Sequence, residues 1–427
     1  MNFYKVLAER FGLSEKAVGL VEEAESRLGE FFLLADQIAS INQLKVLSAM
    51  QRRRLGDAHF LFTSGYGYND LGRDAIEKIY ADVFCAEAAL VRPQLISGTH
   101  AIAAALFGNL RPGDELISAT GKPYETLEKV IGIKSAGGSL AEHGVAYRQI
   151  ELTKQGEIDV GSLREAINSK TKMVMFQRSK GYAWRRSIPA AEIGAAALEI
   201  KKINPDAICF ADNCYGEFVE WDEPTETGAD LIAGSLIKNP GGGLACCGGY
   251  VAGKAALVEA AAERMSAPGL GIETGPMLGF TRMIAQGLFF APQVVAASLK
   301  CAALSARAFE SLGFETLPRS DEARADIVQA IKFSCRESVL AFCKGIQRAA
   351  PVDSFATPEP AQMPGYGCDI VMASGSFTQG SSIELSADAP MKEPFVAYQQ
   401  GGLTWPHARA GVAFAVDSVM KAMGADA

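Results

Sequence analysis

The sequence predicts a mixed α/β protein with a mostly parallel sheet covered by helices on both faces. The main observation is a series of short apolar runs that alternate with amphipathic segments from Ala88 onward. A second is the helical spacing of apolar residues before and after this region, over residues 6–50 and from about residue 291. Strands that alternate with helices are typical of parallel sheets. The expected strands lie within residues 88–94, 114–120, 145–152, 171–179, 206–213, 229–236 and 248–254.

The same pattern divides the chain into expected domains. Residues 1–55 are expected to form an N-terminal helical arm, and residues 56–290 the large α/β domain. Residues 291–427 are expected to form a smaller α+β domain, in which long helical patterns precede Ser376–Pro390. A chain of 427 residues has the length of two or three ordinary domains.

Composition limits the classes of partner. The chain has a formal net charge of −8, and its basic residues are dispersed apart from Gln51–Gly56. We therefore expect neither nucleic acid nor a membrane surface as a partner. The N-terminal segment lacks the apolar core of a signal peptide, and we expect no later run to be both long and uncharged enough to span a bilayer, so a cytoplasmic location is expected. The 9 cysteines lack paired CxxC spacing, and no metal site is expected.

Lys238 lies where an open α/β sheet presents its ligands. It follows the apolar run Ala229–Gly234 and precedes the glycines of "NPGGG", a turn-forming loop where the backbone can approach a ligand closely. A loop lysine is usually solvated. A chemical role for Lys238 therefore depends on partners from elsewhere in the chain.

Two other expected strand ends supply such partners. The turn Ser97-Gly98-Thr99 precedes an amphipathic helix, so it could hold a phosphate, although serine and threonine are also good helix caps. Asp212 ends an apolar run; it could simply cap a turn or could face a protonated pyridine nitrogen. A phosphate turn, an aspartate and a lysine 26 residues later (238 − 212) follow the order of a pyridoxal 5'-phosphate (PLP) enzyme. Together they make Lys238 a Schiff-base candidate.

At the level of whole motifs, the sequence resembles fold type I PLP enzymes, whose fold is that of aspartate aminotransferase. Within that group it is similar to the cystathionine lyases and methionine γ-lyases, and most similar to the bacterial aluminium-resistance protein family. The resemblance runs from Gly65 to Pro390. The motifs that carry it are GYGYNDLGRD, SGTHAIAAALFG, TGKPYETLEKVIG, QRSKGYAWRRS, ADNCYGEFVE, SLIKNPGGGLA and TQGSSIELSADAP.

The resemblance implies roles for the residues in these motifs. Lys238 would bind PLP as a Schiff base, and Asp212 would pair with the pyridine nitrogen. The other cofactor-binding residues implied are Ser97, Gly98, Thr99 and Ser235 at the phosphate, and Tyr124 stacked on the ring.

A shared active site is also implied. Tyr68 and Arg73 resemble the Tyr/Arg pair that reaches the phosphate from a neighbouring subunit, which implies a homodimer or homotetramer. The alternative for Arg73 is a surface ion pair with a residue such as Asp70 or Asp74.

The sequence departs from the better-known lyases at the arginine that binds the substrate carboxylate. The segment Gly401–Gly411 offers Arg409 without the context found in those enzymes. Arg178, Arg185 and Arg186 are rival carboxylate ligands. The sequence leaves the choice open.

The implied activity is that of a PLP-dependent carbon–sulfur lyase in amino-acid metabolism. It would eliminate a thiol from an amino acid of the cystathionine, cysteine or methionine type, with Tyr124 or Tyr68 assisting proton transfer to sulfur. Lys238 would act as the base, and we expect partial desolvation and a neighbouring cation to lower its pKa. Transamination, aldol cleavage and a PLP-binding module without lyase turnover remain alternatives.

An alternative interpretation from another functional class is that the chain contains the nucleotide-binding loop of an NTPase. Gly248–Ala255 matches GxxxxGK, but Ala255 replaces the magnesium-binding Ser or Thr, and the segment itself has the pattern of a strand. The sequence therefore disfavours an NTPase.

Overall fold

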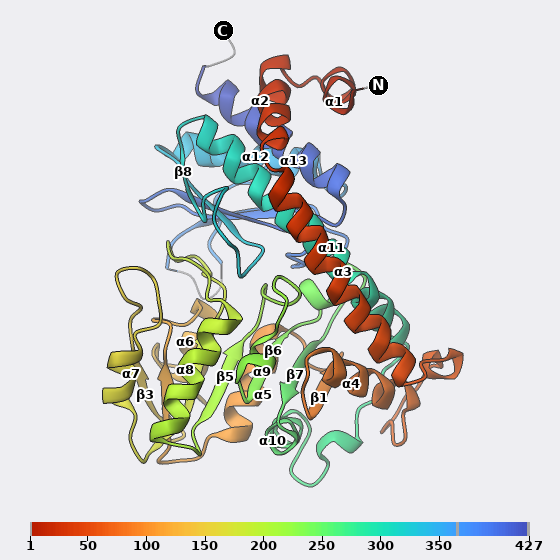
Figure 1. Ribbon diagram of the computed structural model, residues 1–427, viewed down its shortest axis with the longest axis vertical. Coiled ribbons are helices and arrows are strands. Elements are labelled where there is room, and N and C mark those ends of the chain that lie inside the picture. The colour runs from red at the N-terminus through yellow and green to blue at the C-terminus, as the bar shows by residue number, and fades with distance from the viewer. Residues whose placement is uncertain (1, 364–366, 425–427) are drawn as a thin grey trace. The chain divides into compact units, whose positions relative to one another are not determined.

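The computed structural model describes residues 2–363 and 367–424. The chain forms two compact units. One comprises residues 41–181 and 187–291, and the other residues 1–40, 182–186 and 292–427. Figure 1 labels many of the elements of both.

The first unit is built on a seven-stranded sheet in the order β1-β7-β6-β5-β4-β2-β3. Each of the predicted apolar runs contains one of its strands. Neighbours from β6 to β3 pair in parallel, whereas β7 is antiparallel to both β1 and β6. The strands are β1 (Ala88–Arg92), β2 (Glu115–Ser118), β3 (Ala146–Gln149), β4 (Thr171–Gln177), β5 (Ile208–Asp212), β6 (Leu231–Ser235) and β7 (Gly249–Gly253).

The antiparallel β7 follows from the connection that precedes it. Only a short 3-10 helix, η2 (Asn239–Gly241), lies between β6 and β7. A parallel return would need a longer crossover, usually an α-helix, so the chain folds straight back beside β6. This hairpin places the Lys238 loop at one end of the sheet.

Helices cover the sheet on both faces. α5 (Gly98–Asn109) and α10 (Ala255–Met265) pack on each other and on β7, and Val251 joins their apolar core. Since side chains alternate along a strand, Tyr250 faces the opposite side, where its ring stacks on Phe84 with centroids 5.1 Å apart. The other helices of this unit are η1 (Asp57–Phe60), α4 (Leu71–Val83), α6 (Glu125–Ile131), α7 (Val160–Ala166), α8 (Ala190–Ile203), α9 (Pro224–Thr227) and η3 (Gly271–Glu273).

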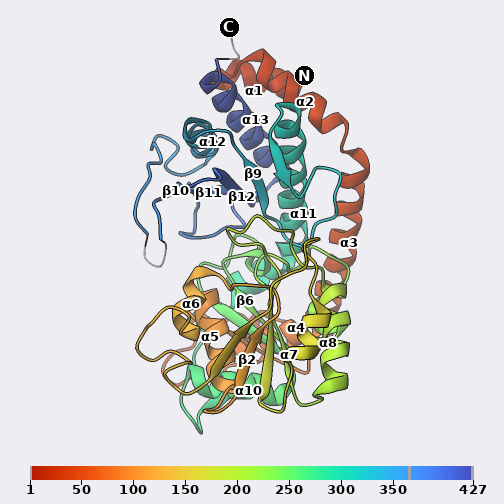
Figure 2. The same cartoon turned by 90° about the vertical axis from the view of Figure 1, so that its left-hand side faces the viewer.

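The second unit contains a five-stranded antiparallel sheet in the order β10-β11-β12-β9-β8, part of which is labelled in Figure 2. α12 packs on this sheet and on α13, and α2 packs on α13. The elements are α1 (Phe3–Phe11), α2 (Glu15–Ser26), β8 (Glu315–Leu317), β9 (Gln329–Lys332), α12 (Arg336–Ala349), β10 (Ile370–Ser374), β11 (Ser386–Pro390), β12 (Val396–Gln400) and α13 (Trp405–Ala422).

Two long helices, α3 (Gly29–Arg52) and α11 (Thr281–Ser311), contribute residues to both units. By length and composition α11 could cross a membrane, which corrects the expectation that no run of the chain is long and apolar enough. However, 78% of its most apolar window is buried inside the protein. A helix that is buried in this way is apolar because it belongs to a protein core.

Candidate active site

The predicted lysine and aspartate lie at the carboxyl ends of neighbouring parallel strands. Asp212 is the last residue of β5, and Lys238 follows the end of β6. Asp212 pairs in register with Ala233 of β6, and the next backbone N–H, that of Asn213, donates to the Ala233 carbonyl oxygen at 3.0 Å. The sheet therefore brings the two predicted residues to the same edge.

The predicted phosphate turn lies against both of these strand ends. Ser97 is the N-cap of α5, and its Oγ accepts the His100 backbone N–H at 3.1 Å. A Cβ atom on Gly98 would lie 3.2 Å from the Cys214 Sγ and 3.3 Å from the Ser235 Cβ. The helix N-terminus therefore approaches the turn after β5 and the end of β6 closely, and glycine permits that approach. The Thr99 hydroxyl lies 2.9 Å from the Thr126 hydroxyl.

Tyr124 is the N-cap of α6, in the loop that follows β2, and is bound to the end of β4. Its backbone N–H donates to the Gln177 side-chain oxygen at 2.7 Å, and Gln177 is the β4 partner of Asp212 in the sheet. A Cβ atom on Gly181 would lie 3.2 Å from the Tyr124 ring. The structure thus places the predicted Tyr124, Asp212, Ser97 turn and Lys238 at one edge of the sheet.

Lys238 is half-buried, and an aromatic ring that the sequence did not single out lies beside its charge. Its Nζ lies 3.9 Å from the centroid of the Tyr215 ring. Burial alone lowers the pKa of Lys238, but electrostatic interactions with the acidic groups around it, Asp212 and Glu217 among them, outweigh burial and raise this pKa above its ordinary value. The protein's own groups thus favour the ammonium form, and the expected lowering of this pKa by a cation at the bound cofactor stays a prediction.

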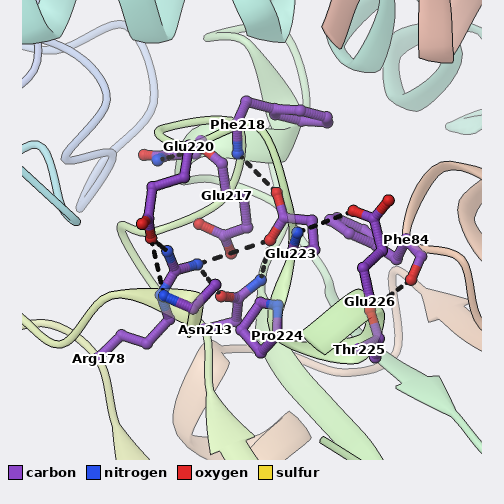
Figure 3. Close-up of polar contacts among 12 residues, drawn as sticks. Phe84, Arg178, Asn213, Glu217, Phe218, Glu220, Glu223, Pro224, Thr225 and Glu226 are labelled. Carbon is purple, nitrogen blue, oxygen red and sulfur yellow. Dashed lines mark hydrogen bonds and ion pairs between the residues drawn. The ribbon is translucent and has the colours of Figure 1, made fainter. Parts of the chain in front are cut away.

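The turn after β5 has an unusual backbone. Tyr215 has a φ of +71° and Phe218 a φ of +62°, in the left-handed region that residues other than glycine rarely adopt. A buried polar cluster beside the turn, drawn in Figure 3, holds this conformation. The Phe218 N–H donates to a Glu223 carboxylate oxygen at 2.8 Å, and the Asn213 side chain donates to the other Glu223 oxygen at 3.0 Å.

Arg178 lies inside this cluster and is fully buried. Its guanidinium donates to the Asn213 side-chain oxygen at 2.5 Å, forms an ion pair with Glu220, and lies 3.6 Å from a Glu223 oxygen. The side chain predicted as a carboxylate ligand is thus bound to carboxylates of its own chain.

Glu217 and Tyr250 form a second buried pair. Both are completely buried, and the Tyr250 hydroxyl donates to Glu217 Oε1 at 2.8 Å. Burial raises the pKa of Glu217 to about 8. Glu217 comes one residue after Gly216 in the motif that contains Asp212, so its position near the strand end was readable from the sequence, but its burial was not.

Tyr68 lies in the loop that precedes α4, and Arg73 lies in the first turn of α4. Tyr68 is 57% exposed and stacks on Tyr66. Arg73 is only 2% exposed; its Nε lies 2.9 Å from Asp74, and its NH1 donates to the carbonyl oxygens of Gly67 and Glu273. In the described part of the chain, no hydrogen bond or ion pair joins Tyr68 or Arg73 to Lys238.

The other predicted carboxylate ligands belong to the unit that contains the five-stranded sheet. Arg409 lies over the Phe3 ring at 3.6 Å from its centroid and forms a 3.3 Å ion pair with Glu25. The Arg185 guanidinium donates to the Arg186 carbonyl oxygen at 2.8 Å. The substrate-binding role of these arginines stays a prediction.

The sheet order and the residues at its edge define a protein of the fold type I class predicted from the sequence. Comparison with known proteins places the chain within that class. Residues 17–420 match the family model described as methionine gamma-lyase, and the chain belongs to this family. The YnbB protein of Bacillus subtilis is 51% identical over 401 residues, which cover 93% of this chain and 95% of that protein.

Comparison with solved structures supports the same family and fold. A carbon–sulfur lyase involved in aluminium resistance from Clostridium novyi is 46% identical, with a TM-score of 0.93 over 97% of this chain and 98% of the other. The pyridoxal-5'-phosphate-dependent protein YhfS of Escherichia coli is 16% identical, with a TM-score of 0.61 over 91% of this chain and 96% of the other, and shows the fold alone. The predicted family and fold class are confirmed.

Proposed function

We propose that this protein is a PLP-dependent carbon–sulfur lyase that eliminates a thiol from a sulfur-containing amino acid. The observation that carries the proposal is the convergence of Lys238, Asp212 and the N-terminus of α5 at one edge of the sheet. The family and the name of the Clostridium novyi relative support the reaction class. A sulfur amino acid of the cystathionine, cysteine or methionine type is the proposed substrate.

The residues at this edge suit PLP. A helix N-terminus with the hydroxyls of Ser97 and Ser235 nearby suits a phosphate. The buried Asp212 carboxylate suits a protonated pyridine nitrogen, and the aromatic face of Tyr124 suits a planar ring. Lys238 is the lysine at this edge that would hold the cofactor covalently.

In the proposed reaction, PLP supplies an electron sink that makes the substrate Cα–H acidic. The protein residues move and hold protons. The Lys238 amine takes the proton from Cα, and the Asp212 carboxylate keeps a proton on the ring nitrogen. The Tyr124 hydroxyl donates a proton to the departing sulfur, which leaves as a thiol. Because Lys238 is stabilised as an ammonium by its neighbours, it must lose a proton before it can act as a base.

A homodimer or homotetramer with shared active sites is part of the proposal. Within one chain Tyr68 is exposed and Arg73 is buried. Tyr68 is therefore the more suitable of the two residues to reach a neighbouring subunit, and Arg73 would support the loop from within.

Borohydride reduction tests the cofactor assignment. The reduced holoprotein should carry the cofactor on Lys238 in a peptide map, and Lys238→Ala should abolish the label while the fold remains. Lys254→Ala is the matched control, because Lys254 lies after β7 in an ion pair with Asp230. A label on any other lysine would refute the assignment.

An amino-acid panel tests the reaction. Cystathionine, cysteine and methionine are incubated with the holoprotein, and 2-oxo acid, ammonia and free thiol are measured together. Joint release of all three supports elimination. Transamination or aldol cleavage without thiol release would overturn the lyase proposal and leave the cofactor assignment standing.

A further inference from the structure

Glu217 is a buried carboxylate that the proposed reaction does not use. Its Oε1 accepts the Tyr250 hydroxyl, whereas its Oε2 is buried without a hydrogen-bond partner among the described residues. Leaving a carboxylate oxygen unpaired in the protein interior is costly. Such a group calls for an explanation other than stability.

The backbone makes room for Glu217 beside the strand that leads to the lysine. Gly234 lies opposite Tyr250 in the β6–β7 pair, and a Cβ atom on it would lie 2.7 Å from Glu217 Oε1 and 2.5 Å from Tyr250 Cε1. Asn239, the residue after Lys238, donates from its side chain to the Glu217 carbonyl oxygen at 3.0 Å. Glu217 is therefore tied to both sides of the Lys238 position.

The charges of Glu217 and Lys238 act on each other. Burial raises the pKa of Glu217 to about 8, and a nearby Glu223 charge acts in the same direction. The Glu217 backbone N–H, the Tyr250 hydroxyl and the Lys238 ammonium oppose them. The Glu217 carboxylate also helps burial to raise the pKa of the Tyr80 phenol in α4 and of the Cys214 thiol. Lys238 is the cation among the main influences on the Glu217 pKa.

We propose that Glu217 is a positioning residue for Lys238: its buried carboxylate, held beside the strand that leads to the lysine, sets how readily the lysine loses its proton. When Glu217 is ionised, the Lys238 ammonium is stabilised. When Glu217 is protonated, this stabilisation is lost and the Lys238 ammonium gives up its proton to solvent more readily. This inference rests on the proposed function for its purpose, since a lysine must be neutral both to bind a carbonyl and to act as a base.

The pH dependence of Lys238 acylation in the cofactor-free chain tests this coupling. Acetic anhydride is supplied in trace amount from pH 6 to pH 10, and the Lys238 peptide is quantified by mass spectrometry. Only the neutral amine reacts. In the natural chain the rise with pH should flatten near pH 8, where Glu217 ionises and stabilises the ammonium.

Glu217→Gln should remove this break. Its Lys238 should react like that of the natural chain near pH 6 and about tenfold faster near pH 10, because an adjacent carboxylate shifts a lysine by about one unit or more. Glu217→Asp keeps the charge and should keep a break. Glu77→Gln is the matched control: Glu77 is also buried with its pKa raised to about 7 by burial, but its cation is Arg92 at 3.0 Å.

Identical profiles for Glu217→Gln and the natural chain would overturn the proposal. If Glu217→Gln does not fold, Tyr250→Phe tests the coupling instead. Loss of the Tyr250 hydrogen bond should raise the Glu217 pKa and so move the break in the acylation profile to higher pH. A break that stays at the same pH would overturn the coupling. The experiment is independent of the cofactor assignment. A failed borohydride label at Lys238 would remove the proposed function and leave the measured coupling intact.

Discussion

The Nζ atom of Lys238 lies 3.9 Å from the centroid of the Tyr215 ring. Tyr215 reaches this position with a φ of +71°, a conformation that stores strain in a residue with a side chain. The Gly216 N–H donates to the Asn213 carbonyl oxygen at 2.9 Å, and Arg178 fixes the Asn213 side chain. A buried cluster thus holds a strained turn that presents an aromatic face to the lysine.

Tyr215→Leu should make Lys238 easier to deprotonate at every pH. A cation over an aromatic face is stabilised by roughly 0.5–2 kcal/mol. Its loss should raise the rate of Lys238 acylation several-fold without removing the break near pH 8 expected from Glu217. Tyr215→Phe keeps the ring and is the control. Equal rates in the leucine variant and the natural chain would contradict a role for the ring.

Gly234→Ala should destabilise the protein. The new Cβ would lie 2.5 Å from Tyr250 Cε1 and 2.7 Å from Glu217 Oε1, both buried, so the pair must shift. Forcing an atom into a packed core costs about 1–3 kcal/mol. Gly19→Ala is the opposite control, because no atom lies within 4 Å of its Cβ position in α2 and alanine favours a helix. Urea denaturation compares the two; an unchanged midpoint for Gly234→Ala would contradict the packing.

The sequence predicted the strands and the lysine–aspartate edge because both follow from local patterns of apolar runs and strand ends. It could not predict the environment of that edge. The sequence offers Arg178 as a candidate carboxylate ligand, yet its partners Glu220 and Glu223 follow 42 and 45 residues later (220 − 178 and 223 − 178) and reach it only through the β4–β5 pairing.

Two other features of this edge of the sheet could not be predicted from local sequence patterns. Glutamates are rarely buried, so nothing distinguished Glu217 from a surface residue. A positive φ is normally a property of glycine, so the conformation of Tyr215 was not readable either. Both depend on contacts made by residues distant in sequence, including Tyr250 and Arg178.

Arg178→Ala should be strongly destabilising. The change leaves Glu220 and the buried Glu223 without their cation, and breaking a buried ion pair from one side costs about 3–5 kcal/mol. Arg164→Ala is the control, since Arg164 and Glu199 form an ion pair at the surface that should contribute at most about 1 kcal/mol. Equal denaturation midpoints for the two variants would show that the Arg178 cluster is not structural.

The free energy of unfolding should fall as the pH rises from about 4.5 to about 8, because Glu217 ionises in this range. Its pKa is raised by burial from 4.5 to about 8, so the folded state holds a proton that the unfolded state releases in this window. The stabilisation is complete below the unfolded pKa and is lost as pH rises through the folded pKa. Glu217→Gln should flatten the dependence measured by urea denaturation at several pH values. A slope as steep as that of the natural chain would contradict the burial of an ionisable Glu217.

Mixing two inactive variants tests the shared active site. Tyr68→Ala removes an exposed side chain and should fold, and Lys238→Ala removes the proposed cofactor lysine. If Tyr68 acts in the neighbouring subunit, a hybrid dimer has one site with both residues intact, and random re-association restores about a quarter of the natural sites. Tyr68→Ala mixed with itself is the control. Confirmed hybrids without recovered activity would show that Tyr68 and Lys238 act within the same chain or that Tyr68 has no part in the site.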